Sequence, residues 1–123
     1  MLLLALLGCP GNTMETGCAS PSVHILEPAP DAVVCGTPLV VELEICGIEL
    51  VDPYTGGEAP GTGHVDITLN GQDISMIGGE HTEVPDVTPG DYQLKVELSN
   101  ADHTPIEPYA GEFLYITVDP SAC

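Results

Sequence analysis

Basic side chains are almost missing from this sequence. It holds 19 Asp and Glu residues against a single Lys, Lys95, and no Arg, which gives a formal net charge of −18 at pH 7. Nucleic acid binding requires Lys and Arg to displace the counterions around phosphates, and anionic lipid headgroups repel an acidic protein. The composition therefore excludes nucleic acid partners. It leaves cationic ligands and divalent ions, or a self-repelling surface that only keeps the protein soluble.

Aromatic residues and catalytic motifs are also scarce. Trp is absent and Phe113 is the one phenylalanine, whereas Leu, Val and Ile are plentiful, so we expect an aliphatic core. The sequence contains no His-Glu-x-x-His, no Gly-x-Ser-x-Gly and no Gly-rich phosphate loop that ends in Lys-Ser or Lys-Thr. These absences predict a protein that is not an enzyme.

The N-terminal residues are apolar and lead to a cysteine. Residues 1–7 are followed by Gly8 and Cys9, and the resulting Leu-Leu-Gly-Cys motif resembles the lipobox of bacterial lipoproteins. The resemblance implies a signal peptide at residues 1–8, a lipid on the Cys9 thiol and a place in the bacterial cell envelope, outside the cytoplasm and in the outer membrane. Residues 9–21, rich in Gly, Pro, Ser and Thr, are then a lipidated flexible tether. The alternatives are an ordinary cleaved secretion signal and a buried strand that happens to precede a cysteine.

The remaining four cysteines form an even set: Cys18, Cys35, Cys46 and Cys123. None of them is arranged as Cys-x-x-Cys, which argues against zinc and against a thioredoxin-like redox motif. We therefore expect two disulfides, which persist in exported proteins rather than in the cytosol. Four cysteines allow three pairings, and their spacing alone does not choose among them.

Short alternating segments between Pro- and Gly-rich turns predict β-strands and no helix of useful length. The clearest run is 39–46, in which Val41, Leu43 and Ile45 point one way and the intervening glutamates the other. Asn70-Gly71 predicts a tight hairpin turn, and residues 52–63 an exposed loop. The other strands are expected at 23–27, 64–70, 74–77, 82–87, 92–99 and 112–118. The 82–87 strand is placed at a sheet edge because Pro85 interrupts it.

Seven strands within residues 22–119 match the size of an immunoglobulin-like sandwich. In residues 86–96 a Pro-Gly turn precedes Tyr92 and an alternating apolar strand, which resembles the penultimate strand of bacterial Ig-like and fibronectin type III-like modules. The predicted fold class is an all-β, immunoglobulin-like antiparallel β-sandwich, with residues 120–123 as a C-terminal tail. In that topology Cys18 and Cys46 lie at one pole and Cys35 and Cys123 at the other, which implies the pairing Cys18–Cys46 and Cys35–Cys123.

The histidines are the residues that suggest a site. His64 begins one predicted strand and His103 follows the penultimate one, and these two strands are antiparallel neighbours in the Ig-like topology. His81 is expected at the same pole, and His24 lies near the start of the first strand. Neutral imidazole is a good ligand for copper and for zinc, and a nearby carboxylate adds an oxygen ligand or orients the ring. The candidate metal ligands are therefore His64, His81, His103 and His24, with Asp66 and Asp102 beside them.

The sequence thus predicts a lipid-anchored, non-catalytic module of the cell envelope with a binding or structural role and no resident cofactor. Its partners would be the membrane, through the lipid, and an unknown envelope protein or cationic ligand. The alternative is an exported copper- or zinc-binding protein that uses the clustered histidines. Calcium is a further candidate because carboxylates are many, but no stretch fits the twelve-residue EF-hand loop, and a solvated acidic face competes with it.

Overall fold

The computed structural model describes Cys18, residues 20–51 and residues 61–123, without the side chains of residues 75–78. The predicted signal peptide, Cys9, most of the tether and most of the 52–63 loop lie outside the described residues. None of the described residues belongs to a helix with the length and apolar character that a membrane crossing needs.

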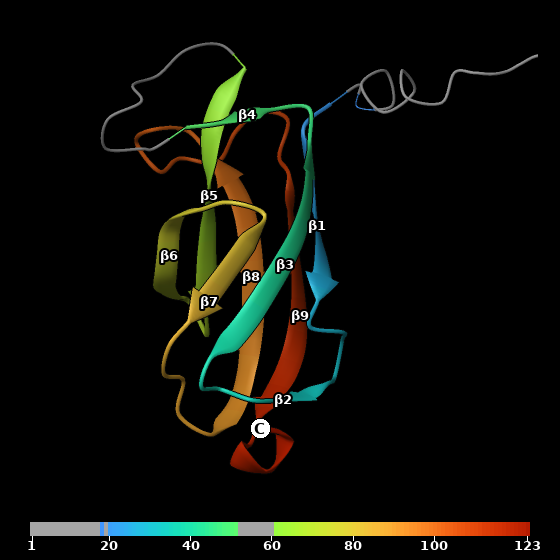
Figure 1. Cartoon of the computed structure of the whole chain (residues 1–123). Coiled ribbons are helices and arrows are strands. Elements are labelled where there is room, and N and C mark those ends of the chain that lie inside the picture. The colour runs from blue at the N-terminus through green and yellow to red at the C-terminus, as the bar shows by residue number, and fades with distance from the viewer. Residues whose placement is uncertain (1–17, 19, 52–60) are drawn as a thin grey trace, which may run out of the picture.

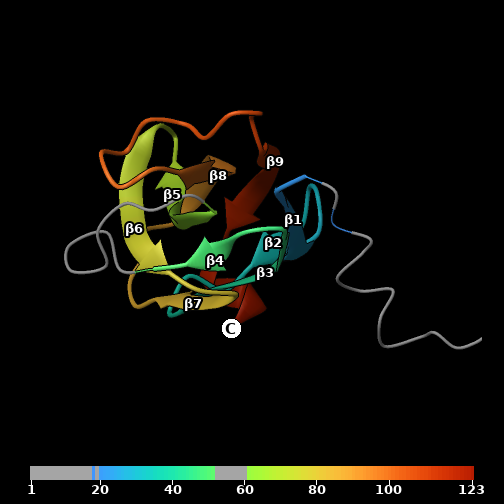
Figure 2. The same ribbon diagram turned by 90° about the horizontal axis from the view of Figure 1, so that it is seen from above.

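Two β-sheets packed face to face make up the described part of the chain (Figures 1 and 2). The smaller sheet is antiparallel in the order β1-β3-β7. The larger sheet has the order β2-β9-β8-β5-β4, with β6 also paired to β5. The 3-10 turn η1 (Pro120–Ala122) forms part of the predicted C-terminal tail. The strands are β1 (Ser22–Glu27), β2 (Val33–Val34), β3 (Leu39–Cys46), β4 (Glu49–Leu50), β5 (Thr62–Leu69), β6 (Gln72–Gly78), β7 (His81–Val84), β8 (Gly90–Ser99) and β9 (Gly111–Val118). The predicted all-β sandwich is confirmed.

The core lies between the two sheets and is aliphatic, as predicted. Side chains of alternate residues point inward, and the long strands of both layers contribute to the core. Ile45, predicted to share a face with Val41 and Leu43, packs against the core from a partly buried position, as does Tyr92. Burying one such aliphatic side chain contributes roughly 1.5–3 kcal/mol. The buried apolar residues are Val23, Leu39, Val41, Leu43, Val65, Ile67, Leu69, Leu94, Val96, Leu98, Ile106, Ala110, Leu114, Ile116 and Val118.

The bounds of some strands differ from the prediction, because pairing with strands distant in the sequence sets where they begin and end. Thr62 and Gly63, predicted as loop, belong to β5 because β4 pairs with them in parallel. A Cβ at Gly63 would lie 2.7 Å from the Ser99 carbonyl oxygen, so only glycine lets the backbones of β5 and β8 come this close. The edge strand β7 ends at Val84, just before Pro85, which has no N–H for the ladder. The two-residue strands β2 and β4 are too short to show a periodic pattern.

The Pro-Gly turn before β8 is held by a tyrosine hydrogen bond. The Tyr92 hydroxyl donates to the Thr88 carbonyl oxygen at 2.7 Å and lies 2.9 Å from the Thr88 hydroxyl. This tyrosine corner is a recurrent feature of immunoglobulin-like sandwiches. It gives a physical reason for the sequence pattern around Tyr92, because the ring packs on the core while its hydroxyl fastens the preceding turn.

Two disulfides close opposite ends of the sandwich. Cys18 is bonded to Cys46 with a Cα–Cα distance of 5.7 Å, and Cys35 to Cys123 with 4.7 Å. These are the same partners as in the sequence-based prediction. Figure 1 shows the C-terminus beside β2, at the end of the molecule opposite the start of β1.

We expect the Cys35→Ser/Cys123→Ser variant to lose about 2–5 kcal/mol of unfolding free energy. The bond closes a sequence separation of 88 residues, against 28 for Cys18–Cys46. Because loop-closure entropy grows with the logarithm of loop length, the Cys18→Ser/Cys46→Ser variant should lose about 1 kcal/mol less. Denaturant unfolding of the three oxidised proteins measures both values. A larger loss from the shorter loop would contradict the entropic explanation.

Candidate metal centre

The outer face of the larger sheet carries the polar residues of the candidate site. His64 and Asp66 are two residues apart on β5, and their neighbours Val65 and Ile67 are fully buried in the core, so the alternation of the strand places both polar side chains on the face away from the core. In the antiparallel register of β5 and β8, His64 lies opposite Ser99 and Asp66 opposite Glu97. The predicted neighbourhood of these two strands is confirmed.

A compact turn after β8 brings His103 to the same place. The His103 N–H donates to the Asn100 carbonyl oxygen, and the Asn100 N–H donates to the Thr104 carbonyl oxygen, both at 2.8 Å. The Asp102 carboxylate accepts from the Thr104 hydroxyl at 2.6 Å and from its N–H at 3.1 Å. These two hydrogen bonds hold the Asp102 pKa below its usual range. Within this turn His103 has a φ of +68°, which is uncommon for a residue other than glycine.

Three donor atoms converge within this cluster. Nε2 of His64 lies 3.1 Å from Nδ1 of His103 and 3.0 Å from Oδ1 of Asp66. The third edge, between Nδ1 of His103 and Oδ1 of Asp66, is 3.5 Å. The two imidazole rings are nearly perpendicular, with an interplanar angle of 81°. The Ser99 hydroxyl donates to the other oxygen of Asp66 at 2.7 Å, which fixes the carboxylate.

Two buried polar atoms of the cluster have no hydrogen-bond partner among the described residues. One is Oδ1 of Asp66, the oxygen that faces the two imidazoles, and the other is Nδ1 of His64. The His64 side chain is 1% exposed and that of Asp66 13%. A buried polar atom without a partner costs about 1–3 kcal/mol. A bound ion would engage Oδ1 of Asp66, and so would an N–H on Nε2 of His64, which lies 3.0 Å away.

The dimensions of the cluster fit a transition metal ion. A circle through the three donor atoms has a radius of about 1.9 Å, and zinc lies roughly 2.0–2.2 Å from nitrogen and carboxylate ligands. An ion at that distance from all three atoms sits about 0.9 Å outside their plane, as zinc does above one face of its tetrahedron of ligands. His64, Asp66 and His103 are the one group of three or more such residues in the described part of the chain whose ligand atoms come this close together.

His81 and His24, also named as candidate ligands, do not join this cluster. His81 begins β7, which pairs with β3 in the smaller sheet, and its two ring nitrogens contact the carboxylates of Glu42 and Glu83. His24 lies on β1 with Nδ1 3.4 Å from the Glu112 carboxylate. Asp102, the second candidate carboxylate, instead holds the turn next to His103.

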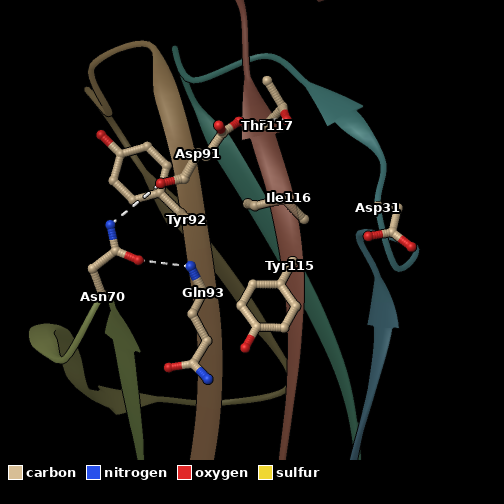
Figure 3. Close-up of a pocket in the computed structure, with 8 residues that line it drawn as sticks. All are labelled: Asp31, Asn70, Asp91, Tyr92, Gln93, Tyr115, Ile116 and Thr117. Atoms are coloured by element: carbon tan, nitrogen blue, oxygen red, sulfur yellow. Dashed lines mark hydrogen bonds between the residues drawn. The ribbon is translucent and has the colours of Figure 1, made fainter.

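An exposed aromatic pair on the same sheet face was not anticipated. Phe113 and Tyr115 are each 56% exposed and their rings contact edge to face on β9. Tyr115 also lines an open groove of about 500 Å³. Figure 3 shows Gln93 and Tyr115 projecting from paired positions of β8 and β9, while the Asn70 side chain accepts from the Gln93 backbone N–H. The alternation of the 112–118 strand could have predicted this pair. Leu114 and Ile116 point inward, so their neighbours Phe113 and Tyr115 must point outward.

The comparisons with known proteins concern the fold. No protein family model matches the chain, and no curated protein matches it either. The fibronectin(III)-like modules of Clostridium thermocellum CbhA match with a TM-score of 0.52 and 17% identity, over 79% of this chain and 96% of theirs. An engineered protein matches with a TM-score of 0.50 and 15% identity, over 82% of this chain and 20% of its own. The chain therefore has a fibronectin type III-like fold.

We expect His81 to keep its proton to higher pH than a free histidine. Hydrogen bonds to Glu42 and then Glu83 raise its pKa above 6.5. Because the pKa is raised in the folded protein, any stabilisation is complete below pH 6.5 and is lost as pH rises through the folded pKa. NMR titration of the imidazole protons measures this pKa, and Glu42→Gln should lower it. A His81 pKa at or below 6.5 would refute the proposed pairing.

Proposed function

We propose that the chain is an exported, non-catalytic module held at a bacterial envelope membrane by a lipid on Cys9. The observation that carries the exported location is the pair of disulfides across a fibronectin type III-like sandwich, because disulfides are rare in cytosolic proteins. The lipobox-like motif supports the anchor. The acidic surface offers no basic patch for anionic lipids, so acyl chains would provide the attachment to the membrane.

Tethering explains how such a module would act. A lipid on Cys9 restricts the domain to the membrane surface, and residues 9–21 give it reach, which raises its effective concentration near other envelope components. Recognition would fall to loops or to the outer sheet face. A net charge of −18 favours a partner with basic side chains, or a metal cation.

Binding of a copper or zinc ion is the second candidate function. It is favoured by the convergence of Nε2 of His64, Nδ1 of His103 and Oδ1 of Asp66, the last of which is buried without a hydrogen-bond partner within the described residues. Metal-bound histidines normally donate their other N–H to an acceptor, and its loss weakens binding about 10- to 100-fold. Because Nδ1 of His64 has no such acceptor in the described part of the chain, we propose an exchangeable ion rather than a permanent one.

Replacing Cys9 with serine should move the protein from the membrane fraction to the soluble fraction. Serine has no thiol to carry the diacylglyceryl group, and the described residues include no membrane-crossing helix. Fractionation of cells that express each protein, with mass spectrometry of the N-terminus, measures the effect. Replacing Cys18 and Cys46 together serves as the control, because it also removes cysteine but leaves Cys9 intact. Unchanged membrane retention of the Cys9→Ser protein would rule out this anchor.

Zinc should bind the oxidised protein with 1:1 stoichiometry, and His103→Ala should weaken binding at least tenfold. His103 is the suitable target because its side chain is 41% exposed, so alanine there should not disturb the core. Zinc at 100 times its Kd should stabilise the fold by about 2.7 kcal/mol. Calorimetric titration and thermal unfolding give both quantities.

The matched controls for zinc binding are His81→Ala and His24→Ala. Each removes an exposed histidine that contacts a carboxylate away from the cluster. Both proteins should bind zinc as the parent does. Equal uptake by the parent and by His103→Ala would exclude the cluster as the site.

A further inference from the structure

The metal cluster is closed on one side and open on the other. His64 forms its floor, with a side chain that is 1% exposed, whereas the His103 side chain is 41% exposed. A pocket of about 190 Å³ adjoins the cluster and shares Asp66 and His103 with it. The rest of the pocket wall comes from Thr68, Asp73, Lys95 and Glu97.

The cluster supplies three donors, and a tetrahedral ion needs four. Within the described residues no fourth His, Cys, Asp or Glu converges with His64, Asp66 and His103. The Ser99 hydroxyl donates to the second oxygen of Asp66, so it is placed beside the carboxylate and not among the three converging donor atoms. A fourth ligand therefore has to arrive from outside these residues, and the adjoining pocket is the route to the exposed side of the cluster.

The charge of the pocket wall restricts what that ligand is. Asp73 and Glu97 make the wall acidic, and Nζ of Lys95 lies 3.6 Å from the Glu97 carboxylate, so the one ammonium is already paired. Within the pocket Asp73 and Glu97 outweigh the one lysine, so an anion that enters meets local repulsion that opposes the attraction of the bound ion. A neutral nitrogen donor meets no such repulsion, and imidazole suits both zinc and copper.

We infer that the ion bound at His64, Asp66 and His103 keeps one coordination position open to this pocket, and that a neutral imidazole is the ligand class that fills it. The inference rests on the metal binding proposed above. The pocket holds about six water volumes, at roughly 30 Å³ each, which is enough for a five-membered ring. The imidazole belongs either to a small molecule or to a histidine side chain of a partner protein.

Cobalt(II) tests this inference, because its visible absorption reports each change of ligand at a tetrahedral site. The full chain with Cys9→Ser, oxidised and loaded with cobalt, is titrated with imidazole and separately with acetate at constant ionic strength. We expect a saturable spectral change with imidazole, and a half-maximal acetate concentration at least tenfold higher. Elemental analysis after gel filtration confirms that cobalt stays bound.

A charge-matched pair of variants tests the role of the wall. Asp73→Asn removes a carboxylate from the pocket, and Asp86→Asn removes one from the exposed connection between β7 and β8. We expect acetate to bind two- to threefold more tightly to Asp73→Asn and with unchanged affinity to Asp86→Asn. Equal effects of the two substitutions would contradict a local electrostatic selection.

A second ligand, N-acetyl-histidine methylamide, distinguishes a small-molecule imidazole from the histidine side chain of a partner protein. A spectral change with both ligands supports a partner's histidine, and a change with free imidazole alone supports a small molecule. No change with any ligand while cobalt is retained would overturn the open position, and tighter binding of acetate than of imidazole would overturn the ligand class. Failure to take up cobalt or zinc at all would instead overturn the metal site itself.

Discussion

The antiparallel register between β5 and β8 is the constraint on which the rest of the structure depends. It pairs positions from His64 with Ser99 to Leu69 with Leu94. Because side chains alternate between the two faces, a slip of one residue would turn Val65 and Ile67 to solvent and drive His64 and Asp66 into the core. The same register therefore places the aliphatic side chains in the core and the polar side chains of the cluster on the outer face of the sheet. Burial of the core side chains supplies the free energy that holds the cluster in place.

The other half of the cluster depends on how the β8–β9 connection is fastened. His103 occupies a left-handed backbone conformation, which costs roughly 1–2 kcal/mol for a residue with a Cβ. The Asn100 N–H donates to the Thr104 carbonyl oxygen and the Asp102 carboxylate accepts from the Thr104 hydroxyl, which holds the turn around it. Beyond the turn, Ile106 is buried and its N–H donates to the Leu98 carbonyl oxygen. The strained residue is thus held from both sides, which is the usual condition for strain at functional positions.

The sequence pattern predicted which side chains of a strand face the core. It did not predict which of the two sheets a strand joins, because that depends on the path of the chain in three dimensions. Period-two hydrophobicity accounts for the inward residues of β3, β5, β8 and β9, and the approach of His64 to His103 followed from strand adjacency. His81 was predicted to lie at the pole of His64 and His103. Residues 78–82 contain no pattern that indicates the pairing of β7 with β3 in the smaller sheet, so the separation of His81 from the cluster could not be predicted. The choice between Asp66 and Asp102 likewise depended on a hydrogen-bonded turn that becomes visible only in three dimensions.

The acidity of the chain and the chemistry of the cluster have different roles in any cation binding. Net charge attracts every cation, and at physiological salt it is screened over about 8 Å, so distant carboxylates do not discriminate between ions. Magnesium and calcium prefer oxygen ligands, whereas two imidazoles and one carboxylate suit zinc or copper. Selectivity therefore has to come from the two nitrogen atoms held 3.1 Å apart by β5 and the turn after β8. In the proposed metal binding, the acidic surface would set how often a cation arrives, and these two nitrogens would set which cation stays.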